Sequence, residues 1–242
     1  MKTFRKAILI IHGFAGGTYD QENLANYLEL NPMFDVYTFT LPGHDVKDSK
    51  LATKEEWIKK SEGILNYLIK HGYKSIYLIG HSMGGVIASY LATKYKQVKK
   101  LVLAAPSFTH IASKEEGGLV KAAFKSKELM EAYSTSEFFT RIKKLPISAL
   151  KEFLNLVNEY QYTIEKISVP TLILQGTKDQ MVPPKSNERV FEKLNIEKKA
   201  LLKINGAYHD LFKGEKLEPI EIEVEKFLKK PKFMIKQEIK EI

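Results

Sequence analysis

The chain contains no cysteine among its 242 residues. Disulfides, thiolate nucleophiles, thiolate zinc sites and cysteine-held iron–sulfur clusters are therefore excluded. Long hydrophobic runs are missing too, since no stretch approaches the ~20 apolar residues of a membrane span. The apolar run at 7–11, which follows the basic N-terminal residues, is too short for a signal-peptide core and leads into no cleavage-site pattern. We therefore expect a cytoplasmic protein without stable membrane insertion.

Arginine is scarce, although the net charge is +9. Only Arg5, Arg141 and Arg189 are present, and the basic excess is spread along the chain. Basic and acidic groups number 14 and 9 in residues 1–106, 8 and 8 in 107–165, and 16 and 12 in 166–242. Proteins that read bases and phosphates favour arginine for its bidentate fork. We therefore expect a lysine-rich solvated surface and no nucleic-acid partner.

Apolar segments alternate with helical patterns along most of the chain, whose length suits one large α/β domain. Segments rich in Ile, Leu and Val predict strands at 7–11, 36–39, 76–79, 101–105, 171–175 and 200–204. Helices are expected at about 19–30, 53–70, 83–95, 185–194 and 219–228. The alternation predicts a mostly parallel sheet with helices on both faces.

Residues 107–166 interrupt this alternation, because they contain helix-like clusters and no clear strand. An interval of this length between two strands is unusual. We interpret it as a helical lid inserted into a core formed by residues 1–106 and 167–242, and the alternative is extra scaffold helices packed elsewhere. Residues 233–242 follow a proline and are expected to form a short terminal helix or a frayed tail.

The most informative motif is Gly80-His81-Ser82-Met83-Gly84, between a predicted strand and a predicted helix. In a G-x-S-x-G nucleophile elbow, a sharp turn lifts the serine hydroxyl above the end of the sheet. Side chains two residues before and after the serine would collide in that turn, so glycine is favoured there. The simpler alternative is an ordinary strand–helix turn.

A serine nucleophile needs a base within hydrogen-bond reach and an acid that orients the base. Asp179 and His209 each lie just beyond a predicted strand, downstream of Ser82 and about thirty residues apart. A turn or cap for the aspartate and a structural role for the histidine are the competing interpretations. Asp210 is a rival acid, but as the neighbour of His209 in sequence it is poorly placed to reach the imidazole.

An ester oxyanion needs two preorganised N–H donors. One candidate is the backbone N–H of Met83, at the start of the helix after the elbow. The other is the N–H of Phe14, in the glycine-containing loop after the first strand. His12, at the end of that strand, is expected to brace the loop.

With these residues assembled, the chain resembles the α/β-hydrolase superfamily, and more narrowly the bacterial carboxylesterase and monoacylglycerol lipase group. The resemblance runs over residues 7–228. It is carried by His12-Gly13-Phe14, Leu41-Pro42-Gly43-His44, Gly80-His81-Ser82-Met83-Gly84-Gly85, Ala105-Pro106, Asp179-Gln180-Met181-Val182 and the loop with His209.

This resemblance implies an α/β-hydrolase fold with a helical lid, and Ser82, Asp179 and His209 as a catalytic triad. It also implies an oxyanion hole from Phe14 and Met83 and no cofactor or metal. The chain departs from the family where leading antiparallel strands look short or missing and where Asp45 follows His44. It departs again where Tyr208 stands in place of a small residue, which would narrow the site near the base.

The expected activity is hydrolysis of a small-molecule carboxylic ester with a short-to-medium acyl chain. Residues named for an apolar substrate pocket are Phe124, Leu129, Tyr133, Phe138, Phe139, Phe153 and Tyr208. Core packing would explain the lid residues equally well. A monoacylglycerol lipase, a thioesterase and a carbon–carbon bond hydrolase are alternatives on the same triad, and a non-catalytic ligand-binding relative is the alternative from another class.

Overall fold

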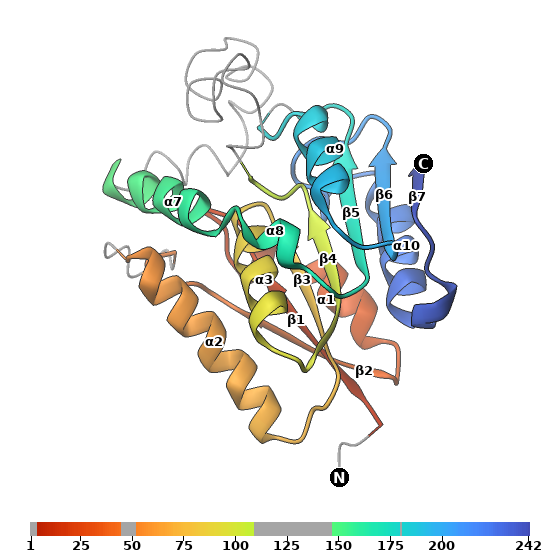
Figure 1. Ribbon diagram of the computed structural model, residues 1–242, viewed down its shortest axis with the longest axis horizontal. Coiled ribbons are helices and arrows are strands. Elements are labelled where there is room, and N and C mark those ends of the chain that lie inside the picture. Colours follow the sequence, from red (N-terminus) through yellow and green to blue (C-terminus); the bar gives the residue numbers. More distant parts are fainter. Residues whose placement is uncertain (1–3, 45–51, 109–146, 180) are drawn as a thin grey trace.

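Seven parallel strands form one sheet in the structure, a computed structural model that describes residues 4–44, 52–108, 147–179 and 181–242 (Figure 1). Their order across the sheet is β2-β1-β3-β4-β5-β6-β7. The strands are β1 (Lys6–Ile11), β2 (Phe34–Phe39), β3 (Ile76–His81), β4 (Val98–Ala104), β5 (Thr171–Gly176), β6 (Lys199–Ile204) and β7 (Glu238–Glu241). The parallel α/β architecture predicted from the alternation is confirmed.

Successive side chains of the inner strands pack into two separate cores. Leu9 and Ile11 of β1 point into one core, and Ile8 and Ile10 point into the other. All four are fully buried, because helices cover both faces of the sheet. This explains why the inner strands are almost continuously apolar.

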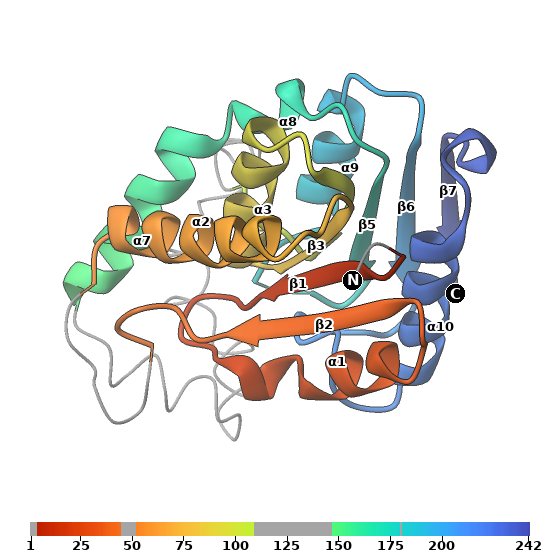
Figure 2. The same ribbon diagram turned by 90° about the horizontal axis from the view of Figure 1, so that it is seen from below.

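The first and last connections between strands place their helices on one face of the sheet, and the connections between them place theirs on the other (Figure 2). One face carries α2 (Lys54–Lys70), α3 (Met83–Lys94), α7 (Ile147–Tyr160), α8 (Thr163–Lys166) and α9 (Pro184–Lys193). The other face carries α1 (Glu22–Glu29), which follows the short 3-10 helix η1 (Thr18–Asp20), and α10 (Leu217–Lys229). None of the helices in the described ranges is both long and apolar enough to cross a membrane.

The helix ends follow local sequence signals. Thr53 and Glu56 form a capping box at the start of α2, in which each side chain accepts a hydrogen bond from the other residue's backbone N–H. Pro184 opens α9, at a position where a missing N–H is harmless. These signals determine where the two helices begin.

The described part of the 107–166 interval is helical and packs on the rest of the domain. Helix α7 lies against α3 and α2, and α8 lies against α3 and α9. Leu156 and Val157 of α7 are fully buried in the core shared with α3. The stretch 109–146 lies outside the described residues, so the division into core and lid stays a prediction.

The expectation for the C-terminal segment was wrong. Residues Lys232–Met234 form a 3-10 turn (η4), and Glu238–Glu241 form β7, which pairs in parallel with β6. All four side chains of β7 are exposed, so no apolar pattern predicts the strand. Backbone hydrogen bonds hold the segment, including those from Ile242 N–H to Lys203 O and from Asn205 N–H to Ile242 O.

The strand order determines where a site can form. The chain starts in β1, moves outward to β2, and then crosses β1 to continue with β3. The helices that follow β1 and β3 therefore lie on opposite faces, and open parallel sheets usually bind their ligands at the carboxyl end of the strands where this reversal occurs. The predicted elbow follows β3, and the predicted oxyanion loop follows β1.

Candidate active site

Ser82 occupies a sharp turn between β3 and α3. Its backbone has φ 52° and ψ −118°, and residues other than glycine rarely adopt a positive φ. The Ser82 N–H donates to Ala104 O at 2.9 Å, and the Gly85 N–H donates to Ser82 O at 2.9 Å. This strained turn is the geometry that the G-x-S-x-G spacing predicts.

No side chain fits at the two glycines that flank Ser82, Gly80 and Gly84. A Cβ atom on Gly80 would lie 2.3 Å from Gly84 O, and a Cβ atom on Gly84 would lie 2.2 Å from Ile11 O. Both obstacles are backbone atoms, which cannot rotate away. The elbow is therefore pressed against the end of β1.

Asp179 and His209 form a buried pair from the loops after β5 and β6. His209 Nδ1 donates to Asp179 Oδ2 at 2.8 Å, and both side chains are almost completely buried. Asp179 Oδ1 accepts hydrogen bonds from the backbone N–H groups of Met181 and Val182, each at 2.9 Å. These donors fix the carboxylate, so its other oxygen stays directed at the imidazole. The acid that orients His209 is thus Asp179, while Asp210 contributes to the electrostatic field around the ring.

The imidazole of His209 is held in one tautomer. Because Nδ1 carries the proton that Asp179 accepts, Nε2 keeps its lone pair in the neutral ring. Burial alone would lower the pKa of His209. The Asp179 carboxylate, with a smaller contribution from Asp210, raises the pKa by more than burial lowers it, so the pKa of His209 lies above its ordinary value of 6.5. The arrangement therefore strengthens Nε2 as a proton acceptor.

A hydrogen bond from His81, the last residue of β3, connects the loop that carries His209 to the strand that leads into Ser82. The Nε2–H of His81 donates to His209 O at 3.0 Å, and the two rings lie 4.9 Å apart. Burial lowers the pKa of His81, and so does the neighbouring His209. His81 is therefore neutral and places no second positive charge beside His209. The sequence offered no signal for this contact beyond the position of His81 next to Ser82.

Ser107 lies beside Ser82, and sequence reasoning did not assign it a role. The two Oγ atoms are 2.8 Å apart, and the Ser107 N–H donates to Ser82 O at 3.2 Å. Ser107 lies in the loop after β4, the strand that neighbours β3. A serine just beyond the end of a strand adjacent to the elbow was the available signal.

The loop after β1 approaches Ser82 closely enough to supply an oxyanion donor. A Cβ atom on Gly13 would lie 3.1 Å from Ser82 Cβ, so the backbone leading to Phe14 runs directly against the elbow. Among the described residues, no acceptor is recorded for the N–H groups of Phe14 and Met83. Met83 is the first residue of α3, where the helix dipole favours negative charge.

His12 braces this loop, as expected. Its Nδ1–H donates to Gly13 O at 2.7 Å, and its Nε2 accepts from the Leu41 N–H at 2.9 Å. Complete burial lowers the pKa of His12 to about 3, so the ring is neutral, as the accepting nitrogen requires. His44 packs edge-on against both His12 and Phe14, at 5.2 and 5.7 Å between ring centroids.

Two of the residues named for a substrate pocket lie within the described ranges. Phe153 of α7 stacks on Phe14, with ring centroids 5.3 Å apart, which brings an apolar side chain of the 107–166 interval to the loop after β1. Tyr208 precedes His209 and is 47% exposed. The others lie outside the described residues: Phe124, Leu129, Tyr133, Phe138 and Phe139.

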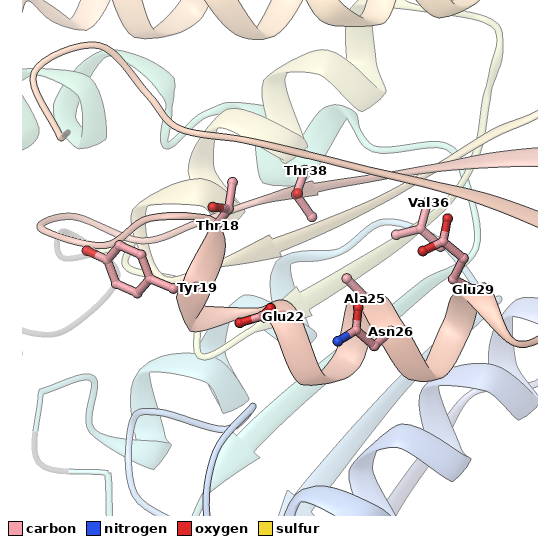
Figure 3. A pocket seen from close by; sticks show the side chains of 8 residues that line it. All are labelled: Thr18, Tyr19, Glu22, Ala25, Asn26, Glu29, Val36 and Thr38. Carbon is pink, nitrogen blue, oxygen red and sulfur yellow. The ribbon is translucent and has the colours of Figure 1, made fainter.

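A separate hollow lies between β2 and the segment that contains η1 and α1 (Figure 3). Glu22, Asn26 and Glu29 line it from α1, and Val36 and Thr38 line it from β2. It includes none of the candidate catalytic residues. Within the described ranges, no group of three or more His, Asp or Glu side chains is arranged to hold a metal ion.

Comparison with protein families agrees with this geometry. Residues 6–121 match the model described as alpha/beta hydrolase fold, and residues 110–216 match the model described as serine aminopeptidase, S33. The chain is an α/β-hydrolase fold protein. This α/β hydrolase is related to bacterial carboxylesterases and monoacylglycerol lipases, as the resemblance implied.

Two curated bacterial relatives cover most of the chain. A carboxylesterase from Bacillus subtilis (strain 168) is 28% identical over 234 residues, which are 93% of this chain and 93% of the relative. A thermostable monoacylglycerol lipase from Bacillus sp. (strain H-257) is 25% identical over 210 residues, which are 84% of this chain and 82% of the relative. Distant homology thus places this α/β hydrolase with the ester hydrolases of the esterase/lipase group.

Solved structures support the fold. The monoacylglycerol lipase of Paleococcus ferrophilus superposes with a TM-score of 0.71 at 20% identity, over 92% of this chain and 93% of that chain. A metagenome-derived lipolytic enzyme superposes with a TM-score of 0.76, also at 20% identity, over 94% of each chain. At 20% identity, this structural similarity supports the fold and says nothing about the activity.

Proposed function

We propose that the protein hydrolyses small carboxylic esters with short-to-medium acyl chains through Ser82, His209 and Asp179. The observation that carries the proposal is the buried hydrogen bond between His209 Nδ1 and Asp179 Oδ2, in a loop that His81, the neighbour of the strained Ser82, binds through the His209 carbonyl. A structural histidine has no need of an oriented carboxylate and a strained neighbouring serine together. The curated carboxylesterase relative, which covers 93% of the chain, supports the ester class.

In the proposed acylation step, Ser82 Oγ attacks the ester carbonyl carbon while its proton passes to His209 Nε2. Asp179 stabilises the imidazolium that forms and keeps its tautomer. The N–H groups of Phe14 and Met83 donate to the oxyanion, whose charge exists only in the transition state and the tetrahedral intermediate. The C–O bond to the alcohol then breaks, and the alcohol leaves with the proton from His209.

Deacylation repeats these roles with water. His209 Nε2 takes a proton from the water molecule as the water attacks the acyl carbon. The bond between that carbon and Ser82 Oγ then breaks, and Oγ recovers its proton from His209. The reaction thus returns the enzyme to its starting state without a cofactor.

Two side chains bear on substrate size in this proposal. Phe153 stacks on Phe14 and offers an apolar surface next to the proposed oxyanion donor, which suits an acyl chain. Tyr208 stands directly before His209, where a bulky side chain disfavours large alcohol groups. Both features support small esters over bulky ones.

The proposal is tested with a fluorophosphonate probe and p-nitrophenyl esters of increasing acyl length. We expect mass-shifted Ser82 after labelling, and hydrolysis that is fastest for short-to-medium chains. Ser82→Ala should remove labelling and lower kcat by roughly four to six orders of magnitude. Folded wild-type protein that neither reacts with the probe nor turns over any ester would instead favour a ligand-binding role.

A monoacylglycerol lipase is the second candidate, because the curated lipase relative covers 84% of this chain. The same purified protein should therefore be assayed on monoacylglycerols beside simple esters and thioesters. A higher kcat/KM on monoacylglycerols than on p-nitrophenyl butyrate would favour the lipase. A thioester preference would place the chemistry with thioesterases on the same triad.

A further inference from the structure

Two buried hydroxyl groups meet at the elbow. Ser82 Oγ and Ser107 Oγ lie 2.8 Å apart, and their residues are 7% and 1% exposed. Because each hydroxyl carries a single proton, only one of the two donates in this contact. The direction of donation decides whether the Ser82 proton is free for another acceptor.

Ser107 has the stronger reason to donate. Among the described residues, Ser82 Oγ is the one hydrogen-bond partner recorded for Ser107 Oγ, and a buried hydroxyl without an acceptor is costly. Ser82 has a second acceptor in the proposed mechanism, namely His209 Nε2. Donation from Ser107 to Ser82 satisfies both protons, whereas the reverse direction leaves the Ser107 proton without an acceptor.

The backbone around Ser107 holds it in this position. Ala105 has a φ of 44°, and its N–H donates to Leu174 O on β5 at 2.8 Å. Pro106 lies so close to the elbow that a Cβ atom on Gly85 would be 2.8 Å from Pro106 Cβ. The Ser107 N–H also donates to the carbonyl of Ser82. The loop after β4 is thus tied to the elbow at several points.

We infer that Ser107 is a positioning residue for Ser82: its hydroxyl donates to Ser82 Oγ and leaves the Ser82 proton directed at His209. This inference rests on the proposed ester hydrolysis. When Oγ attacks the ester carbon, its proton passes to His209, and the Ser107 hydrogen bond remains. When the acyl–Oγ bond breaks in deacylation, Ser107 donates to the oxygen on which negative charge develops. The Ser107 proton itself is never transferred.

The test compares Ser107→Ala with Ser89→Ala, a matched control. Ser89 is another fully buried serine, whose hydroxyl donates to Gly85 O at 2.8 Å within α3. We expect Ser107→Ala to lower kcat on p-nitrophenyl butyrate on the order of tenfold to a hundredfold with KM nearly unchanged, because the lost bond strengthens only as charge develops. Ser89→Ala should keep wild-type kcat and KM.

Active-site titration with the fluorophosphonate counts the competent molecules, so kcat is measured per active site even where a variant folds less well. Ser107→Thr keeps a hydroxyl and should recover most of the kcat that Ser107→Ala loses. Both variants and the control are compared in the same buffer, and thermal unfolding is recorded for each.

Several results would overturn the inference while the proposed function stands. Ser107→Ala with kcat within twofold of wild type would remove any role for the hydroxyl. A rise in KM at unchanged kcat would make Ser107 a substrate contact instead. A folded Ser107→Thr variant no faster than Ser107→Ala would show that the hydroxyl is not what matters. Full activity of Ser82→Ala, by contrast, would remove the proposed function itself.

Discussion

The two ends of the sheet bury polar side chains in different ways. At the carboxyl end, Asp179 and His209 are joined by a hydrogen bond, and Ser82 is held at a positive φ. At the amino end, two buried lysines, Lys100 on β4 and Lys199 on β6, bind the ends of helices. The carboxyl end carries the candidate catalytic groups, and the lysines at the amino end join the helices to the sheet.

The lysines satisfy helix carbonyls that would otherwise have no partner. Lys100 Nζ donates to the carbonyls of Phe227, Leu228 and Lys230 at the end of α10, at 2.8, 2.7 and 2.6 Å. Lys199 Nζ donates to Phe191 O and Leu194 O at the end of α9, at 2.8 and 2.9 Å. Each positive charge also lies at the negative end of a helix dipole. The two helices lie on opposite faces, so each face has one such anchor.

The carboxyl end has backbone donors that the proposed function assigns to a substrate. Within the described ranges, the N–H groups of Phe14 and Met83 have no recorded acceptor, although the elbow around them is tightly packed. The amino end keeps its anchoring donors occupied. Substitutions at the two ends should therefore separate activity from stability.

The largest expected effect is on activity at the carboxyl end, with Asp179→Asn. The remaining amide oxygen still accepts from Met181 and Val182, so the NH2 group faces His209 Nδ1. His209 then keeps its proton on Nε2, which is the wrong tautomer for accepting from Ser82. We expect kcat to fall about 10⁴-fold with little change in thermal stability. A variant that keeps a tenth of wild-type kcat would exclude Asp179 as the orienting acid.

Gly84→Ala should destabilise the fold, because the elbow at the carboxyl end of the sheet has no room for a side chain at this position. The new Cβ atom would lie 2.2 Å from Ile11 O, so the free energy of unfolding should drop by about 3 kcal/mol or more. Gly63→Ala in α2 is the matched control, because nothing lies within 4 Å of its added Cβ atom. In an exposed helix position it should raise stability by about 0.5–1 kcal/mol. Urea unfolding measures both, and equal effects would contradict the steric argument.

Lys100→Met should lower stability and leave the chemistry intact. The loss of donors to three helix-end carbonyls should reduce the free energy of unfolding by about 2 kcal/mol. Lys99→Met removes a neighbouring lysine whose Nζ contacts one local carbonyl, and it serves as the control. Urea unfolding and kcat are measured for both. A loss of kcat in correctly folded Lys100→Met would break the division between the two ends.

The smallest expected effect is the pH dependence of wild-type activity. His209 must be neutral to accept the Ser82 proton, and its folded-state pKa is raised above 6.5, mainly by Asp179. As pH falls through that raised pKa, kcat/KM should decline about tenfold per unit, with the acid limb centred above 6.5. A limb centred below 6.5, measured where circular dichroism shows an intact fold, would contradict the predicted direction.

Much of the fold and the candidate triad followed from local patterns. Apolar runs predicted strands β1 to β6, five of which are inner strands, because strands buried on both faces need apolar side chains throughout. The G-x-S-x-G spacing predicted the strained turn at Ser82, since only glycine fits its neighbouring positions. Asp179 and His209 could be selected because parallel strands bring their carboxyl ends to one edge.

Features that depend on contacts between distant segments escaped prediction. Strand β7 has four exposed side chains and is held by its backbone, so it leaves no hydrophobic pattern. The hydrogen bond between the hydroxyl groups of Ser82 and Ser107 spans 25 positions of sequence, and that from His81 to His209 spans 128. Buried Lys100 looks like any surface lysine until α10 is placed against it.

The parallel direction of all seven strands also decides how the protein is best attached to a surface. The first strand begins at the amino edge, and the last ends at the carboxyl edge, beside the loops that carry the candidate triad (Figure 1). A bead or fusion partner joined ahead of β1 would stand at the opposite end of the strands from the candidate triad. The same partner joined after Ile242 would emerge at the edge that carries the triad loops. Immobilisation through the N-terminal side is therefore the orientation that leaves the candidate site open to solution.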